Sequence, residues 1–116
     1  MNFKAKLRKD LLDDRILKFI SKEKVYWLKA PSPSDLWIVY QIYNERESFY
    51  IDNSNGSRVY YIQVDIYTKD DYTDLEEIIR TVLKEKEYNL GACADLYEKE
   101  TGLYHKAMRF VYTDIL

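Results

Sequence analysis

The stretch that most constrains this fold is residues 58–83, RVYYIQVDIYTKDDYTDLEEIIRTVL, which predicts a strand, a short turn and a helix. In its first part, apolar and polar side chains alternate with a period of two, as in a strand that has one buried face. The apolar positions are Tyr60, Ile62, Val64 and Ile66, and the opposite face carries Tyr61, Gln63, Asp65 and Tyr67. We expect that opposite face to meet water or another subunit rather than the core.

The helix predicted after the turn is amphipathic and begins at Thr73. Its apolar residues fall at i, i+3, i+4, i+7 and i+8, and they are Leu75, Ile78, Ile79, Val82 and Leu83. Thr73 followed three residues later by Glu76 predicts a capping box, in which each side chain accepts a hydrogen bond from the backbone N–H of the other residue. A stripe of this kind needs a covering surface, and the preceding strand supplies one.

The remaining segments predict a second helix and four further strands. Residues 3–22 carry an apolar stripe at helical spacing, and residues 25–28 read as an edge strand after it. Further strands are predicted over 36–43, over 88–99 with a bend or bulge at Gly91, and over 104–115 after a turn at Thr101-Gly102. Residues 44–57 are predicted to form a long loop that ends in the turn signal Asn55-Gly56.

The fold class predicted from this order, α-β-β-β-α-β-β, is α+β. We expect a two-layer sandwich, with a mainly antiparallel sheet of four to five strands and two helices on one of its faces. A chain of 116 residues is predicted to form a single domain, residues 1–116.

Composition narrows the classes of protein that fit. The chain is 33% charged and contains no run of about 18 apolar residues, so no membrane segment is expected. A single cysteine, Cys93, cannot form an internal disulfide and fits a reducing cytoplasm. Residues 1–24 hold eight lysines and arginines against four acids, on a chain whose net charge is −2. This basic end could favour head-to-tail association or contact with nucleic acid, or it could be a solvated helix face.

No constellation of residues announces catalysis or metal binding. His105 is the only histidine, so a transition-metal site is not expected. Cys93 and His105 could pair as nucleophile and base, but no third group that would orient them is evident. With three glycines, the chain offers no Gly-rich phosphate loop, and its acidic clusters lack the pattern of a calcium loop. We therefore predict no enzyme, no cofactor and no metal. Because the body of the chain is acidic and its tyrosine-rich strands lack interleaved basic residues, we also expect no direct contact with nucleic acid.

Tyrosine is the most informative part of the composition. The chain has twelve tyrosines, several of them on predicted strands. Tyr combines a large apolar body with a polar tip, so it is enriched at protein interfaces. Plain strand propensity explains the same enrichment, and both readings stay open.

The arrangement IVYQIY, then FYIDNSN, then RVYYIQVDIYTKDDYTDLEEIIRTVL and finally KAMRFVYTDIL resembles a family of small structural proteins. These are the tail terminator proteins of tailed phages and prophages of Gram-positive bacteria, also called tail-completion, minor structural or head–tail joining proteins. The resemblance covers residues 36–116 and rests on the order of the strands, the Asp52-Asn53 pair and the helix with an acidic start.

This resemblance implies a ring, hexameric in the family, that caps the head-proximal end of the tail tube and ends its polymerisation. The implied partners are copies of the chain, the tail-tube protein and the head connector, and the implied location is the virion tail, with the host cytoplasm during assembly. Two alternatives remain: a head–tail connector or neck protein, and a small cytoplasmic adaptor or hydrolase unrelated to phage. The predicted interface residues are Tyr61, Gln63, Asp65, Tyr67, Phe49, Tyr50, Asp52 and Asn53.

Overall fold

The computed structural model describes residues 1–50 and 53–116, and the side chains outside 49–55. Its two α-helices are α1 (Phe3–Leu11) and α2 (Thr73–Glu85), and a short 3-10 helix, η1, spans Lys22–Lys24. The strands are β1 (Val25–Trp27), β2 (Leu36–Tyr50), β3 (Asn53–Thr68), β4 (Asn89–Glu98) and β5 (Leu103–Ile115). The predicted order of helices and strands is confirmed.

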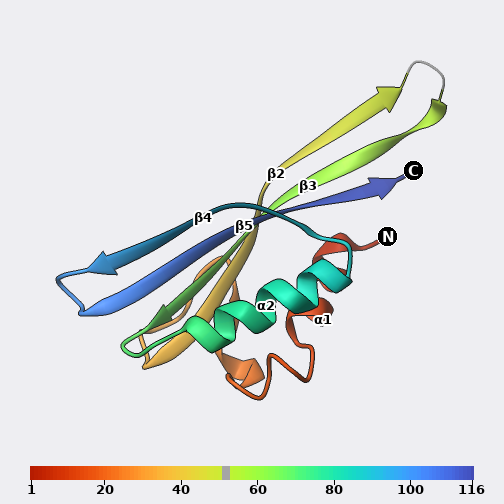
Figure 1. Ribbon diagram of the computed structural model, residues 1–116. Helices are drawn as coiled ribbons and strands as arrows, with labels where there is room; N and C mark the ends of the chain where they lie inside the picture. Colours follow the sequence, from red (N-terminus) through yellow and green to blue (C-terminus); the bar gives the residue numbers. More distant parts are fainter. Residues whose placement is uncertain (51–52) are drawn as a thin grey trace.

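The five strands form one sheet in the order β1-β2-β3-β5-β4. All neighbours are antiparallel except β1 and β2, which are parallel. Both helices lie on the same face of this sheet, which confirms the α+β prediction (Figure 1). Within the described part of the chain, no helix is long and apolar enough to cross a membrane.

The core lies between the helices and the sheet. The predicted apolar face of β3 is buried there, from Tyr60 at 4% exposed to Ile62, Val64 and Ile66 at 0%. Side chains of both helices cover this face: Phe3, Leu7 and Leu11 from α1, and Leu75, Ile79, Val82 and Leu83 from α2. Beside it in the sheet lie Ile38 and Tyr40 of β2 and Met108 and Phe110 of β5. Phe3 anchors α1 by stacking on Tyr60, with ring centroids 4.0 Å apart.

The first helix is shorter than predicted: it ends at Leu11 instead of residue 22. The carboxylate of Asp13 accepts hydrogen bonds from the backbone N–H of Arg15 at 2.9 Å and from its Nε at 3.0 Å. Such a local bond offers the backbone an alternative to the helix. Ile16 and Ile20 are nevertheless buried, so helical spacing of apolar residues continued past the true end of the helix.

The predicted loop over 44–57 is wrong, because β2 runs to Tyr50 and β3 begins at Asn53. Side chains 44–48 are exposed, so no alternation of buried and exposed positions marked this part as a strand. Asn55-Gly56 does not form the hairpin turn either. Ser48 pairs with Ser57 and Tyr50 with Asn53, so three residues of β3 oppose one of β2 in a bulge, where Gly56 has φ +69°.

The start of α2 also differs from the predicted capping box. The N-cap residue is Tyr72, whose side chain makes no capping bond, and Asp71 just before it accepts at Oδ1 from the backbone N of Thr73 at 2.9 Å and from the Thr73 hydroxyl at 2.6 Å. Glu76 turns instead toward Arg80 and Lys106. The buried amine of Lys106 competes for this carboxylate, and that competitor comes from a strand 30 residues further along the chain.

Two predictions about β4 and the turn after it are confirmed. Leu90 pairs with Phe110 and Cys93 with Met108, so two residues oppose Arg109 and a bulge falls at Gly91. A Cβ at Gly91 would lie 3.4 Å from the Arg109 carbonyl oxygen. The turn at Thr101-Gly102 joins β4 to β5, with Gly102 at φ +71°.

We predict that Ile79→Ala destabilises the fold by about 2–5 kcal/mol, because it leaves a cavity between α2 and the sheet. Ile79 is 0% exposed, whereas Ile78 on the same helix is partly exposed. Ile78→Ala is the matched control and should cost clearly less. Urea unfolding measures both free energies, and an equal loss in the two variants would contradict this packing.

Candidate functional site

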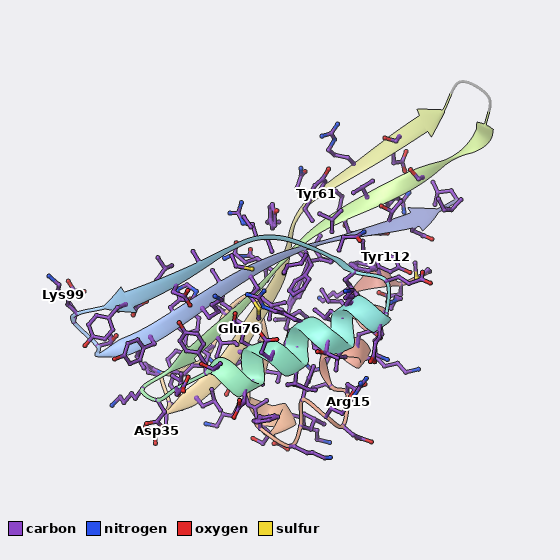
Figure 2. All side chains as sticks on the ribbon, viewed as in Figure 1. Arg15, Asp35, Tyr61, Glu76, Lys99 and Tyr112 are labelled. Atoms are coloured by element: carbon purple, nitrogen blue, oxygen red, sulfur yellow. The ribbon has the colours of Figure 1, made fainter. Side chains whose placement is uncertain are left out.

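The candidate site is the sheet face that the helices leave uncovered. The predicted interface residues Tyr61, Gln63, Asp65 and Tyr67 all belong to this face, because they alternate with the buried residues of β3. Figure 2 shows Tyr61 on the side of the sheet away from α2, and Tyr112 on the side of the helices. The register of β2 and β5 against β3 decides which of their side chains lie beside these four residues on the uncovered face.

One half of the uncovered face holds an aromatic ladder across three strands. Tyr67 pairs with Trp37 of β2 and with His105 of β5. The Tyr67 ring stacks on both neighbours, with centroids 5.0 Å from Trp37 and 4.2 Å from His105. Trp37 packs with Val39 and Leu103 in a second small core. Burial raises the pKa of Tyr67 to about 12, so this phenol stays neutral. Its ring packs between Trp37 and His105.

The middle of the face is a hydrogen-bond network centred on Asp65, whose residue is 4% exposed. Nε2 of His105 lies 2.7 Å from its Oδ1, and Nε2 of Gln63 donates to the same oxygen at 3.0 Å. Gln63 in turn accepts from Nε of Arg109 at 3.1 Å. The network therefore fixes these side chains through contacts within the chain itself.

The exposed end of the network is formed by Arg109, Tyr43 and Tyr61. The guanidinium carbon of Arg109 lies 4.7 Å from the centroid of the Tyr43 ring, and the Tyr43 and Tyr61 rings are 6.1 Å apart. Tyr43 is 41% exposed. A cation over an aromatic ring suits contact with a protein surface that combines apolar and acidic groups.

The structure places the predicted residues in three groups. Gln63, Asp65 and Tyr67 support the face, and Tyr61 is partly exposed on it. Asp52 lies outside the described residues, as do the side chains of Phe49, Tyr50 and Asn53. Sequence reasoning missed Trp37, Tyr43, His105 and Arg109 as members of this face. Alternation in β5 put His105 and Arg109 on one side of that strand, but the pairing of β5 with β3 gave them their neighbours.

The suggested pair of Cys93 and His105 does not form. Cys93 pairs with Met108 and packs against the core beneath the helices. His105, three residues before Met108, points to the uncovered face and meets Asp65. The two side chains therefore lie on opposite faces of the sheet, so they cannot act as nucleophile and base for one substrate.

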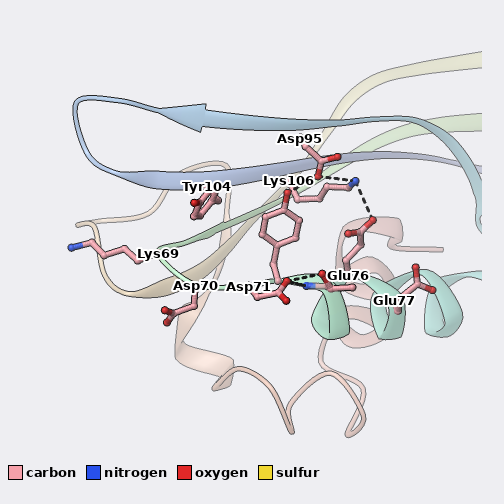
Figure 3. Close-up of a pocket in the computed structure, with 10 residues that line it drawn as sticks. Lys69, Asp70, Asp71, Glu76, Glu77, Asp95, Tyr104 and Lys106 are labelled. Atoms are coloured by element: carbon pink, nitrogen blue, oxygen red, sulfur yellow. Dashed lines mark hydrogen bonds and ion pairs between the residues drawn. The ribbon is translucent and has the colours of Figure 1, made fainter.

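A hollow of about 770 Å³ opens between the start of α2 and the β4–β5 hairpin (Figure 3). Lys106 is 6% exposed there, with its Nζ 3.1 Å from Glu76 and 3.0 Å from Asp95. Burial lowers the pKa of this amine, and the hydrogen bonds to Asp95 and Glu76 outweigh that effect and raise it. No group of three metal-binding side chains comes together among the described residues. The ion pairs join α2 to the β4–β5 hairpin.

The basic residues of α1 are largely engaged within the chain. Lys6 forms an ion pair with Asp10 at 2.6 Å and lies over the rings of Tyr88 and Tyr112. Arg8 donates to the carbonyl of Val25 and to the hydroxyl of Tyr40. Lys6 and Arg8 are thereby held by contacts within the chain, whereas the side chains of Lys4 and Lys9 are exposed.

We predict that Asp65→Ala lowers the free energy of unfolding by about 1–3 kcal/mol, because it leaves the donors of Gln63 and His105 without their acceptor. Gln63→Ala is the control: it keeps the contact between Asp65 and His105 and should cost less. Chemical unfolding of both variants measures the difference. An Asp65→Ala variant with the wild-type free energy of unfolding would show that the network does not stabilise this face.

A second prediction concerns pH. The hydrogen bond from Tyr72, and then the amine of Lys106, hold the pKa of Asp95 below its ordinary value of 3.8. A carboxyl whose pKa is lowered in the folded state stabilises that state above its unfolded pKa, and the contribution is lost as pH falls through the folded pKa. Asp95→Asn should therefore show a flatter loss of stability below about pH 4 than the wild type. Urea midpoints across that range measure it, and the control is Asp14→Asn at an exposed carboxyl outside the ion pairs of Lys106.

Comparison with known proteins finds a likeness at the level of the fold. No protein-family model matches the sequence, and no curated protein is similar to it. Among solved structures, a chain from the virion of a native gene transfer agent particle matches with a TM-score of 0.56 and 12% identity. The match covers 93% of this chain and 90% of that one. At this identity the likeness shows a shared fold over nearly the full length of both chains.

Proposed function

We propose that this protein is a structural component of a phage-like particle. The observation that carries the proposal is the full-length correspondence in fold with a chain of a gene transfer agent virion. The match covers 93% of this chain, whose described structure holds five strands and two α-helices. A fold by itself does not fix a function, so the surface has to agree with it.

Within such a particle, the role we propose is that of a tail terminator, which caps the head-proximal end of the tail tube and helps to join it to the head. The resemblance of residues 36–116 to that family supports this role. The uncovered face also supports it, since a side-chain network fixed in advance lowers the ordering cost of binding another protein. A ring of identical subunits would use this face toward a neighbour or toward the tube.

The contact residues that we propose on this face are Tyr43, Tyr61 and Arg109. They stand at the exposed end of the network, whereas Asp65 is buried and Tyr67 packs between Trp37 and His105. The proposed role is not enzymatic, in keeping with Cys93 and His105 on opposite faces of the sheet.

Deleting the gene from the phage or prophage that carries it tests the proposed role. Electron microscopy of the particles should show tails of abnormal length that fail to join heads, because nothing ends tube growth. Tails of normal length that lie free beside DNA-filled heads would favour a connector role instead. Normal joined particles would contradict both.

A complementation experiment tests the contact residues. Tyr61→Glu with Arg109→Glu should fold but restore few or no normal particles in the deletion strain, because both changes put acidic groups on the face. The control is Glu77→Lys on the exposed side of α2, which should restore particles as the wild type does. If the double variant restored normal particles fully, this face would not be the contact surface.

A further inference from the structure

The two edges of the sheet are both open in the described structure. β4 is an edge strand of ten residues, nine of which are exposed. The opposite edge is β1, with three residues. A long exposed edge strand presents unpaired N–H and C=O groups, and natural proteins usually cover or blunt such an edge. β4 has neither a helix over its outer edge nor a proline in it.

Exposed apolar side chains gather near these same edges. Among the described residues, ten large apolar side chains are exposed, and three of them belong to β4: Leu90 at 46%, Leu96 at 48% and Tyr97 at 56%. Leu28, directly after β1, is 56% exposed, and Phe19, shortly before it, is 44% exposed. An edge that combines free backbone groups with apolar side chains suits the addition of another strand.

The two edges carry opposite charge. Residues 18–29, which contain β1, hold four lysines and one glutamate, a net charge of +3. Residues 89–102, which contain β4 and its turn, hold three acids and one lysine, a net charge of −2. Lys22 and Lys29 are exposed on the first edge, and Glu98 and Glu100 on the second. Like edges would repel each other, and unlike edges attract.

Strand direction agrees with pairing between unlike edges. Within one copy, β4 runs opposite to β1, because the sheet contains one parallel pair and three antiparallel ones. If a second copy is related by rotation about an axis along the strands, its β1 meets the first copy's β4 in antiparallel orientation. Antiparallel pairs are the slightly more stable kind.

We propose that β4 of one copy adds to β1 of the next, so that the sheets of neighbouring subunits continue into each other. The contact is head-to-tail: a different surface is used on each side, which closes into a ring if the rotation allows it. This inference deepens the ring of the proposed function and rests on an oligomer forming at all. The outer part of β2, beyond β1, is a weaker partner, since Glu45, Arg46 and Glu47 put net negative charge beside an acidic strand.

Two charge-reversal variants test the pairing. In the first, Lys22→Glu with Lys24→Glu makes the β1 edge acidic, so that both edges of the subunit are negative. In the second, Glu98→Lys with Glu100→Lys makes the β4 edge basic, so that both edges are positive. Each variant alone should associate roughly tenfold more weakly than the wild type, because its like-charged edges meet. An equimolar mixture should recover wild-type association, since every contact then joins unlike edges.

Size-exclusion chromatography with light scattering measures the association, and circular dichroism checks that each variant is folded. Arg46→Glu on the outer part of β2 is the matched control and should associate as the wild type does. Wild-type association in both variants would overturn the proposal, and so would a wild type that stays monomeric at its highest soluble concentration. Loss of association in only one of the two variants would show that the contact does not join these two edges, and it would also overturn the proposal. This experiment reads subunit association, whereas the deletion experiment reads tail length and head joining, so either proposal can fail without the other.

Discussion

The position of β3 is the constraint on which the rest of this structure depends. β3 pairs along its length with β2 on one side and β5 on the other, so it is the central strand of the sheet. Its face toward the helices is apolar and fully desolvated, and this is where α1 and α2 find a surface to cover. Its other face carries the Asp65 network and one member of the aromatic ladder. Both layers of the molecule, and the surface proposed for assembly, are therefore set by one strand.

A mismatch in length explains why the β2–β3 hairpin extends beyond the helices. The helices have nine and thirteen residues, which corresponds to about 14 and 20 Å. β3 has sixteen residues, or roughly 50 Å when extended. Short helices cover the middle of the sheet, and the β2–β3 hairpin extends beyond them (Figure 1). Segments of this kind gain little stability from the chain's own core.

Local patterns predicted the fold well wherever one side of an element was buried. The alternation in β3 and the stripe of α2 each reported a boundary between core and solvent, and both were confirmed. Prediction failed where that boundary was absent or where a distant residue intervened. Residues 44–48 are exposed on a projecting strand, so nothing in their pattern marked them as β. The carboxylate of Glu76 pairs with the amine of Lys106 on β5 and does not cap the helix as predicted.

By itself, the sequence determined the fold class, the order of the helices and strands and the buried face of β3, since each depends on the local period of apolar side chains. The tertiary structure alone decided what the other face became. Register across β2, β3 and β5 placed His105 against Asp65, and Trp37 against Tyr67. It also sent Cys93 and His105 to opposite faces. The physical reason is that periodicity within a strand says which side chains share a face, whereas pairing between strands decides which of them touch.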